Sequence, residues 1–151
     1  MSREEHGFTL VELMVVVLII AILIAIAIPS FLGARSRAQD RAAQASLRNA
    51  LSGEKIWYVD SEAYTDVIAD LTATESGVAW QAVASAGPNE VYVRIDAADD
   101  QVVCLEAMSE TGTTFVLADI ASGLLAGTHY GTAALPACTW AAASALPFAT
   151  W

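Results

Sequence analysis

The sequence predicts an α+β protein in which one long N-terminal helix packs on a small antiparallel β-sheet. Two observations lead to this class. From Leu13 to Ile28, sixteen consecutive residues have no polar side chain, and a helical pattern continues beyond them. Further along, four short β-rich runs are separated by turn signals. With 151 residues, the chain has the size of one ordinary domain.

Composition and charge divide the chain into parts. Hydrophobic residues make up 56% of it, which excludes a disordered acidic chain. The net charge is −10, yet residues 33–55 carry +3 and the chain from residue 56 onward carries −11, with Arg94 as its one basic residue. An acidic balance argues against neutralising phosphates, so we expect no nucleic-acid partner. The acidic part is expected to present a solvated surface.

The apolar segment is long enough to cross a membrane as a helix. No residue from Leu13 to Ala34 is charged, and these 22 residues span roughly 33 Å at 1.5 Å per residue. In lipid, the need to pair every backbone group internally outweighs the segment's many β-branched residues. Pro29 predicts a bend or a local break in the helical hydrogen bonds. A secretory signal cut after Ala27, a plain membrane anchor and the N-terminal helix of a filament subunit all fit so far.

The string Gly7-Phe8-Thr9-Leu10-Val11-Glu12-Leu13 distinguishes these interpretations. A carboxylate at Glu12 costs about 3 kcal/mol at mid-bilayer and less near an interface, so its presence indicates a partner. The short polar leader, this string, the apolar helix and Pro29 together resemble the type IV prepilin signature. The resemblance covers about the first third of the chain.

The resemblance implies a route of processing and assembly. Prepilin peptidase would cut after Gly7, leaving 144 of the 151 residues with Phe8 as an N-methylated terminus. Glu12, the fifth residue after the cut, would neutralise the terminal amine of a neighbouring subunit, and breaking such a desolvated pair costs roughly 3–5 kcal/mol. The implied partners are further copies of the chain, prepilin peptidase, the pilus assembly machinery and the lipid of the bacterial inner membrane. The implied location is an inner-membrane pool and then a pilus at the cell surface.

The charges around the apolar segment conflict with this orientation. The leader carries Glu4 and Glu5 beside Arg3, and four arginines follow the segment. The positive-inside rule alone would therefore leave the acidic part in the cytoplasm. We give the prepilin signature precedence because it is the more specific signal.

Beyond Pro29 the sequence predicts that the helix continues and ends between Gly53 and Tyr58. One face of it is expected to pack on the sheet: Ala43, Leu47, Ala50, Leu51, Glu54 and Tyr58. A polar strip lies apart from that face: Arg37, Arg41, Gln44 and Arg48. The expected divisions are a leader peptide (1–7), a transmembrane and filament-core half of the helix (8–29), an amphipathic half (30–57) and a globular β head (58–151).

The chain after the helix predicts strands. A connecting loop, Asp60 to Ser76, contains a short helix near Val67 to Leu71. The four expected strands are Val78–Ala84, Glu90–Asp96, Gln101–Met108 and Thr113–Ala121. Because hairpin-length links join them, they predict an antiparallel meander. Residues 122–151 show no periodicity.

Two cysteines complete the predicted fold. If the β head is exported, as the resemblance implies, a disulfide between Cys104 and Cys138 is expected, and it would contribute about 3–4 kcal/mol. The fold class is then a type IV pilin-like fold with a disulfide-closed C-terminal loop. Two unpaired buried cysteines are the alternative.

No catalytic signature is present in the sequence. It has no phosphate-binding loop, H-E-x-x-H, C-x-x-C or G-x-S-x-G motif, so we expect no enzyme, no cofactor and no metal site. His129 is expected to be structural or on the surface. A polar hairpin turn explains Asp96, Asp99 and Asp100 better than calcium binding does.

The function that follows is that of a structural subunit of a type IV pilus. A pseudopilin of a type II secretion system, or a minor pilin, shares every N-terminal feature and remains an alternative. A more distant alternative is a secreted binding protein or enzyme released by a cut after Ala27.

Overall fold

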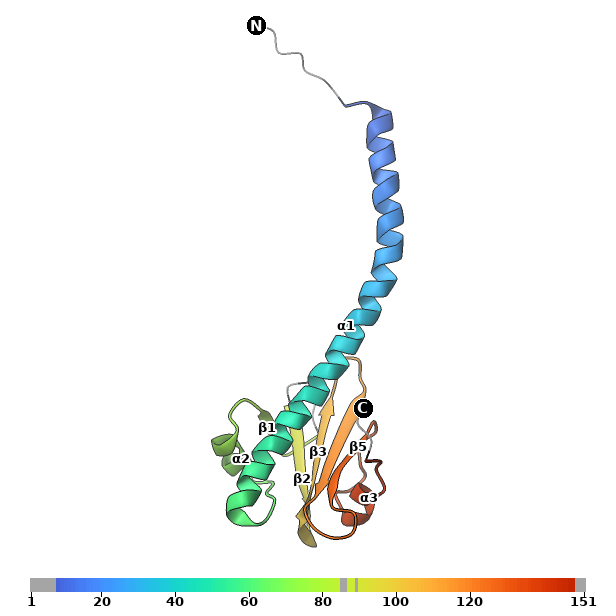
Figure 1. The fold of residues 1–151 in the computed structure, drawn as a ribbon. Helices are drawn as coiled ribbons and strands as arrows, with labels where there is room; N and C mark the ends of the chain where they lie inside the picture. Colours follow the sequence, from blue (N-terminus) through green and yellow to red (C-terminus); the bar gives the residue numbers. More distant parts are fainter. Residues whose placement is uncertain (1–7, 85–86, 89, 149–151) are drawn as a thin grey trace. The chain divides into compact units, whose positions relative to one another are not determined.

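The computed structural model describes residues 8–84, 87–88 and 90–148 of the chain. It divides into two compact units, residues 1–36 and residues 37–151, which we call the N-terminal unit and the C-terminal unit. The elements along the chain are α1 (Leu10–Ser61), α2 (Ile68–Thr74), β1 (Ala79–Gln81), β2 (Glu90–Asp96), β3 (Asp99–Met108), β4 (Thr114–Ile120), β5 (Gly127–Gly131) and α3 (Trp140–Ser144) (Figure 1).

Helix α1 is longer than the sequence predicts. It continues through Pro29 and past Gly53, and it ends at Ser61 rather than between Gly53 and Tyr58. Gly53 does not end the helix because a tertiary contact outweighs its weak helix propensity. The backbone at Gly53 packs so closely that an added Cβ would lie 2.9 Å from Cβ of Glu75. This glycine therefore marks a close packing position rather than a helix end.

The sheet of the C-terminal unit has five strands in the order β1-β2-β3-β4-β5. Strands β2 to β5 form an antiparallel meander, as predicted. Strand β1 pairs parallel to β2, with Trp80 opposite Val91, so the prediction of a wholly antiparallel sheet is wrong at this edge. Only three residues of the predicted run Val78–Ala84 form the strand. The length of the link between two strands does not determine the direction of so short an edge strand. Its Trp80 is buried, and the indole N–H of Trp80 donates a 3.0 Å hydrogen bond to the carbonyl of Glu75.

The two faces of the sheet carry separate cores. One face packs against α1, whose buried residues Ala43, Leu47, Ala50 and Leu51 are those that the helical pattern predicts. Along β3, Val103 and Leu105 belong to this core, whereas the alternate residues Val102 and Cys104 belong to the second core on the opposite face. The second core includes Cys138 and Ala143 of the C-terminal segment. The C-terminal unit is thus built of α1, the sheet and the C-terminal segment, in that order (Figure 1).

The C-terminal segment contains two elements that periodicity does not reveal, β5 and α3. Thr139 caps α3 by accepting a 3.2 Å hydrogen bond from the backbone N–H of Ala142. On β5, His129 is fully buried, and its ring nitrogens lie 2.9 Å and 3.0 Å from the carbonyl oxygens of Leu146 and Leu125. His129 is therefore structural, because it contacts the segments before and after β5, and it is not a surface residue.

Candidate assembly segment

A reciprocal set of hydrogen bonds starts α1. The backbone N–H and the hydroxyl of Thr9 donate to Oε2 of Glu12 at 3.0 Å and 2.7 Å, and the backbone N–H of Glu12 donates to the Thr9 hydroxyl at 3.2 Å. This arrangement is a capping box, in which Thr9 and Glu12 satisfy backbone donors that the first turn leaves open. Glu12 therefore has a local partner in its own chain.

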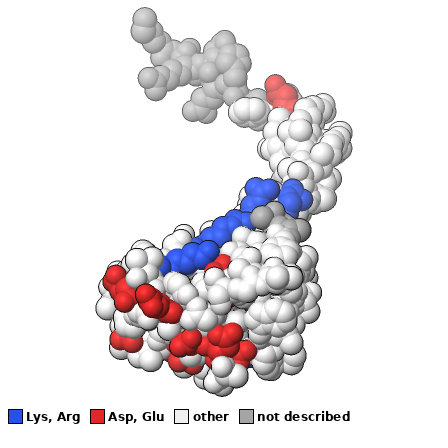
Figure 2. All heavy atoms as spheres, turned by 60° about the horizontal axis from the view of Figure 1, so that its bottom comes forward, with Lys and Arg blue, Asp and Glu red and all other residues white. Residues whose placement is uncertain are grey.

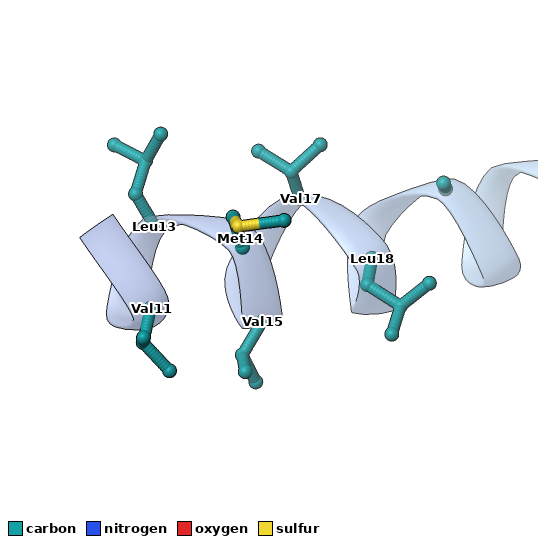
Figure 3. A pocket seen from close by; sticks show the side chains of 7 residues that line it. Val11, Leu13, Met14, Val15, Val17 and Leu18 are labelled. Atoms are coloured by element: carbon teal, nitrogen blue, oxygen red, sulfur yellow. The ribbon is translucent and has the colours of Figure 1, made fainter.

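Beyond this cap, the N-terminal unit presents apolar side chains on every side of α1. Figure 3 shows Leu13 and Val17 on one side of the helix and Val11 and Val15 on the opposite side, as the helical spacing of four residues requires. A helix that is apolar all round needs other apolar surfaces about it, in lipid or in a helix bundle.

The exposure of these side chains confirms that the unit leaves its apolar surface uncovered. Phe8 is 88% exposed, and every large hydrophobic residue from Leu10 to Leu32 is exposed as well. By length and composition, α1 is the one helix among the described residues that could span a membrane, and none of its most apolar stretch is buried. Gly7 lies outside the described residues, and Pro29 lies within α1.

In the C-terminal unit, a buried carboxylate joins α1 to the sheet. Asp119 on β4 accepts hydrogen bonds of 2.5 Å from the Tyr64 hydroxyl and the Thr128 hydroxyl, and Nζ of Lys55 lies 3.2 Å from it. The phenol of Tyr64 has a raised pKa because it is buried and donates to this anion. The Tyr58 hydroxyl also donates to Gln101. These bonds fix the last turns of α1 against β3, β4 and β5.

A second carboxyl on α1 is buried without full pairing. Glu54 is fully buried; its Oε2 accepts a long 3.4 Å bond from the N–H of Thr65, and its Oε1 has no partner among the described residues. Burial raises the pKa of Glu54 to about 8, against a weaker lowering by the Thr65 bond. The side chain is therefore predominantly protonated near neutral pH, consistent with its place on the apolar face.

A third polar group ties α1 to the β3–β4 turn. Oδ1 of Asp40 accepts hydrogen bonds from the hydroxyls of Ser109, at 2.7 Å, and Thr111, at 2.6 Å. The amide of Gln39 donates to the carboxylate of Glu110 in the same turn. The turn between the two central strands is thus attached directly to the helix.

A disulfide and an ion pair are two of the contacts that hold the C-terminal segment to the sheet. Cys104 and Cys138 form the predicted disulfide, with Cα atoms 5.7 Å apart. Arg94 on β2 pairs with Glu106 on β3, and each of them also contacts the backbone of Leu135: Arg94 donates to its carbonyl and Glu106 accepts from its N–H, both at 3.1 Å. The one basic residue of the acidic part of the chain thus has a structural role.

The acidic residues of the β2–β3 turn form local hydrogen bonds. Asp96 accepts from the backbone N–H of Ala98 at 2.9 Å and from that of Trp140 at 2.8 Å, and Asp99 accepts from that of Gln101 at 3.1 Å. Within the part of the chain that the structure describes, no group of three or more His, Cys, Asp or Glu side chains is placed to hold a metal ion. These bonds fit a polar turn.

Comparison with known proteins matches the N-terminal region to a family model and the chain to two relatives. The family model for the prokaryotic N-terminal methylation motif matches residues 2–28, which include Thr9, Glu12 and most of the apolar segment. The type IV wide pilus major component PilA4 of Thermus thermophilus is 35% identical over 63 residues, 42% of this chain and 48% of the relative. The type IV major pilin protein PilA of Myxococcus xanthus is 37% identical over 94 residues, 62% of this chain and 42% of the relative.

These comparisons confirm the resemblance to type IV pilins carrying the prepilin signature. The matched region spans about half the length of the Thermus relative and less than half of the Myxococcus relative. The fold agrees with the prediction as well, because a long N-terminal helix packs on an antiparallel-rich sheet with a disulfide near the C-terminus.

Some functional contacts were not found from the sequence. The capping box carries a local signal, since Thr9-Leu10-Val11-Glu12 has the spacing S/T-x-x-E before an apolar run, and this spacing would have identified it. The pairing of Arg94 with Glu106 depends on strand register, because position 94 lies opposite position 104 in the sheet. No local pattern in the sequence indicates that pairing.

Proposed function

We propose that the chain is a structural subunit of a type IV pilus. The observation that carries the proposal is a capped, uncovered helix that is apolar on every side and carries one carboxylate, Glu12, in its first turn. Such a helix suits a bilayer before assembly and a helical core afterwards. The methylation-motif match at residues 2–28 and the two pilin relatives support it. The work is structural rather than catalytic.

The proposed route follows from the same residues. Prepilin peptidase cuts after Gly7, Phe8 becomes the methylated terminus, and the chain stays in the inner membrane until it is assembled. An assembly machine then adds it to a cell-surface pilus built of copies of the same chain. In this route the Glu12 carboxylate faces two donors: its own Thr9, at the distances given above, and the terminal amine of a neighbouring copy.

The first test of the proposal is the identity of the mature N-terminus. The full chain is expressed together with a prepilin peptidase and its methyltransferase activity, and its intact mass and N-terminal sequence are determined. We expect a chain of 144 of the 151 residues that begins with methylated Phe8. A terminus at Ile28 would support the secreted alternative, and an uncut chain would support a plain anchor. Gly7→Val is the control, and it should remain uncut.

A second test separates the two partners of Glu12 in a host with a type IV pilus machine. Thr9→Ala removes the cap but keeps the carboxylate, and cap loss is worth about 1 kcal/mol, so filaments should persist in reduced amount. Glu12→Gln keeps a hydrogen-bond acceptor but loses the charge, and Glu12→Ala loses both. Both Glu12 variants should remain in the membrane and yield almost no sheared filament. Normal filaments from Glu12→Gln would contradict a charge-pairing role.

The relatives favour a pilus subunit over the other candidates. Both are named as the major component or major pilin of a type IV pilus. The match covers only part of each relative, so the composition of isolated filaments must distinguish a major pilin from a minor pilin or a pseudopilin. A major pilin accounts for most of the sheared filament mass, and deletion of its gene removes the filaments.

A further inference from the structure

Four basic side chains form a line along α1 in the C-terminal unit. This basic stripe consists of Arg37, Arg41, Arg48 and Lys55, all exposed. Spacings of four, seven and seven residues keep them on one side of a helix, and Figure 2 shows basic side chains in a line along the helix. Lys55 pairs with Asp119. Arg37 and Arg41 make no hydrogen bond or ion pair with any described residue.

The acids nearest to the first two arginines are already engaged. Asp40 accepts hydrogen bonds from Ser109 and Thr111, and Glu110 accepts one from Gln39. They reduce the local positive potential but do not pair with the guanidinium groups. The start of the stripe is therefore an exposed cationic surface.

Acidic side chains gather where α1 ends. This acidic patch consists of Asp60, Glu62, Asp99 and Asp100. The side-chain amide of Gln101 connects its two segments by donating to the carbonyl of Glu62 at 2.9 Å and to Oδ1 of Asp100 at 3.0 Å. The last turn of α1 has no basic residue, although the C-terminal end of a helix favours cations. The patch is thus an anionic surface at an already negative helix end.

The first two arginines of the stripe, Arg37 and Arg41, are too far from the acidic patch to pair with it within one copy. From Arg37 to Asp60 the helix rises roughly 35 Å at 1.5 Å per residue, several times the Debye length of about 8 Å at physiological salt. Figure 2 likewise shows acidic side chains gathered beyond the end of the basic line. Arg37 and Arg41 therefore do not meet this patch in their own copy, whereas the patch of a second copy could reach them. Such a contact is head-to-tail, and repeated head-to-tail contacts build an open filament.

We propose that the acidic patch of one copy docks on Arg37 and Arg41 of a second copy. The inference rests on the proposed function, because it adds a second contact between subunits of the same filament. Charge complementarity selects this occupant: an anionic lipid surface or a nucleic acid would engage the arginines but leave the acidic patch without a cation. Exposed ion pairs are individually weak, so the contact acts by repetition at every subunit and by fixing orientation.

The test is charge reversal with rescue in the full chain, made in a host with a type IV pilus machine. The variants are Arg37→Glu with Arg41→Glu, Asp60→Lys with Glu62→Lys, and all four together. Asp66→Lys, an exposed acid outside the patch, is the control for a change of charge alone. Processing, disulfide formation and circular dichroism confirm that each variant matures and folds. The readout is the sheared filament mass and its dependence on salt.

Either double reversal should lower filament yield by about tenfold, and the combined variant should restore it to within about threefold of the unaltered chain. Raising salt should weaken filaments of the unaltered chain and have less effect on those of the double variants. If the unaltered chain forms filaments and the double reversals assemble equally well with the same salt response, the inference is wrong and the proposed function stands. If the unaltered chain forms none, the proposed function fails. If the arginine reversals change only binding to vesicles of anionic phospholipid, the stripe is a lipid contact and the inference is wrong.

Discussion

At the scale of single residues, the two glutamates of α1 show two ways of placing a carboxyl group among apolar side chains. Glu12 lies in an exposed apolar segment and is stabilised by donors at the helix start. Glu54 lies in a packed core with one oxygen unpaired, and it is stabilised by taking up a proton. Both positions were recognised from sequence as residues of α1, but only Glu12 was singled out. The helical pattern places Glu54 on the face that packs on the sheet, but its bond from Thr65 and its raised pKa depend on a segment after the helix that the pattern does not include.

The raised pKa of Glu54 makes stability depend on pH. The folded chain holds this proton up to about pH 8, whereas the unfolded chain releases it near the ordinary value of 4.5. The stabilisation is therefore complete below about pH 4.5, falls as pH rises, and is lost above about pH 8. Glu54→Gln removes this dependence and should be more stable than the unaltered chain at pH 9, by roughly 4–5 kcal/mol, with little difference at pH 5.

Urea unfolding of the full chain in detergent at the two pH values measures this difference. Glu62→Gln, an exposed carboxylate just beyond α1, is the matched control and should behave like the unaltered chain. Equal stability of Glu54→Gln and the unaltered chain at both pH values would show that Glu54 is ionised in the fold.

At the scale of elements, alternation and turn residues predicted β2 with its bounds, and β3 and β4 to within a few residues. They failed at β5, because Gly127-Thr128-His129-Tyr130-Gly131 has no apolar alternation and is recognised only by its pairing with β4. The parallel direction of β1 was likewise not predicted, because this strand has only three residues and is recognised by its pairing with β2. Alternation of apolar and polar residues therefore predicts the central strands, whereas the edge strands form through pairing with a neighbouring strand and have no such alternation of their own.

The helix also carries a packing prediction at Gly53. Replacing glycine by alanine within a helix normally stabilises by up to about 1 kcal/mol. Here the new Cβ would lie 2.9 Å from Glu75 Cβ and 3.3 Å from the Trp80 ring, so Gly53→Ala should destabilise instead, by about 1–3 kcal/mol. Thermal unfolding checks this, with the exposed Asn49→Ala as control. A stabilised Gly53→Ala chain would contradict the close contact.

The residues around Leu135 and Cys138 should stay in place after the loss of either the disulfide or the ion pair, but not after the loss of both. Replacing Cys104 and Cys138 by serine should reduce the free energy of unfolding by about 3–4 kcal/mol, while Arg94 and Glu106 still hold Leu135. Adding Glu106→Ala leaves Arg94 without its carboxylate partner, so the part of the segment around Leu135 and Cys138 should be released, although the contacts of Asp96 with Trp140 and of His129 with Leu146 remain. Chymotrypsin, which cuts beside the aromatic residues of this segment, measures release. Rapid cleavage of the serine variant alone would show that the ion pair holds nothing.

At the scale of the whole molecule, the two units differ in what they need in order to be stable. All residues of both cores lie within the C-terminal unit, and the N-terminal unit leaves its large apolar side chains exposed. The sequence predicted this division through its charges and its uncharged segment. In the structure the C-terminal unit begins at Arg37, and the first residue of α1 that is buried in its core is Ala43.

A chain of residues 37–151 should therefore fold alone as a soluble protein with its disulfide formed, whereas the full chain should require detergent. Its unfolding transition should match that of the C-terminal unit within the full chain. Circular dichroism, thiol titration and sedimentation check these points. Aggregation or an unfolded spectrum would show that the N-terminal unit contributes to the core.

The N-terminal part of α1 is apolar around its whole circumference, and this has a mechanical consequence. The side chains of this segment are apolar on every side of the helix (Figure 3). Rotating the helix about its own axis therefore presents much the same apolar surface to its surroundings. A bundle of such helices lacks an angular preference set by burial, and small turns or slides between neighbours leave the buried apolar area nearly constant. A fibre with such a centre is expected to stretch and twist under load at little cost in buried apolar area.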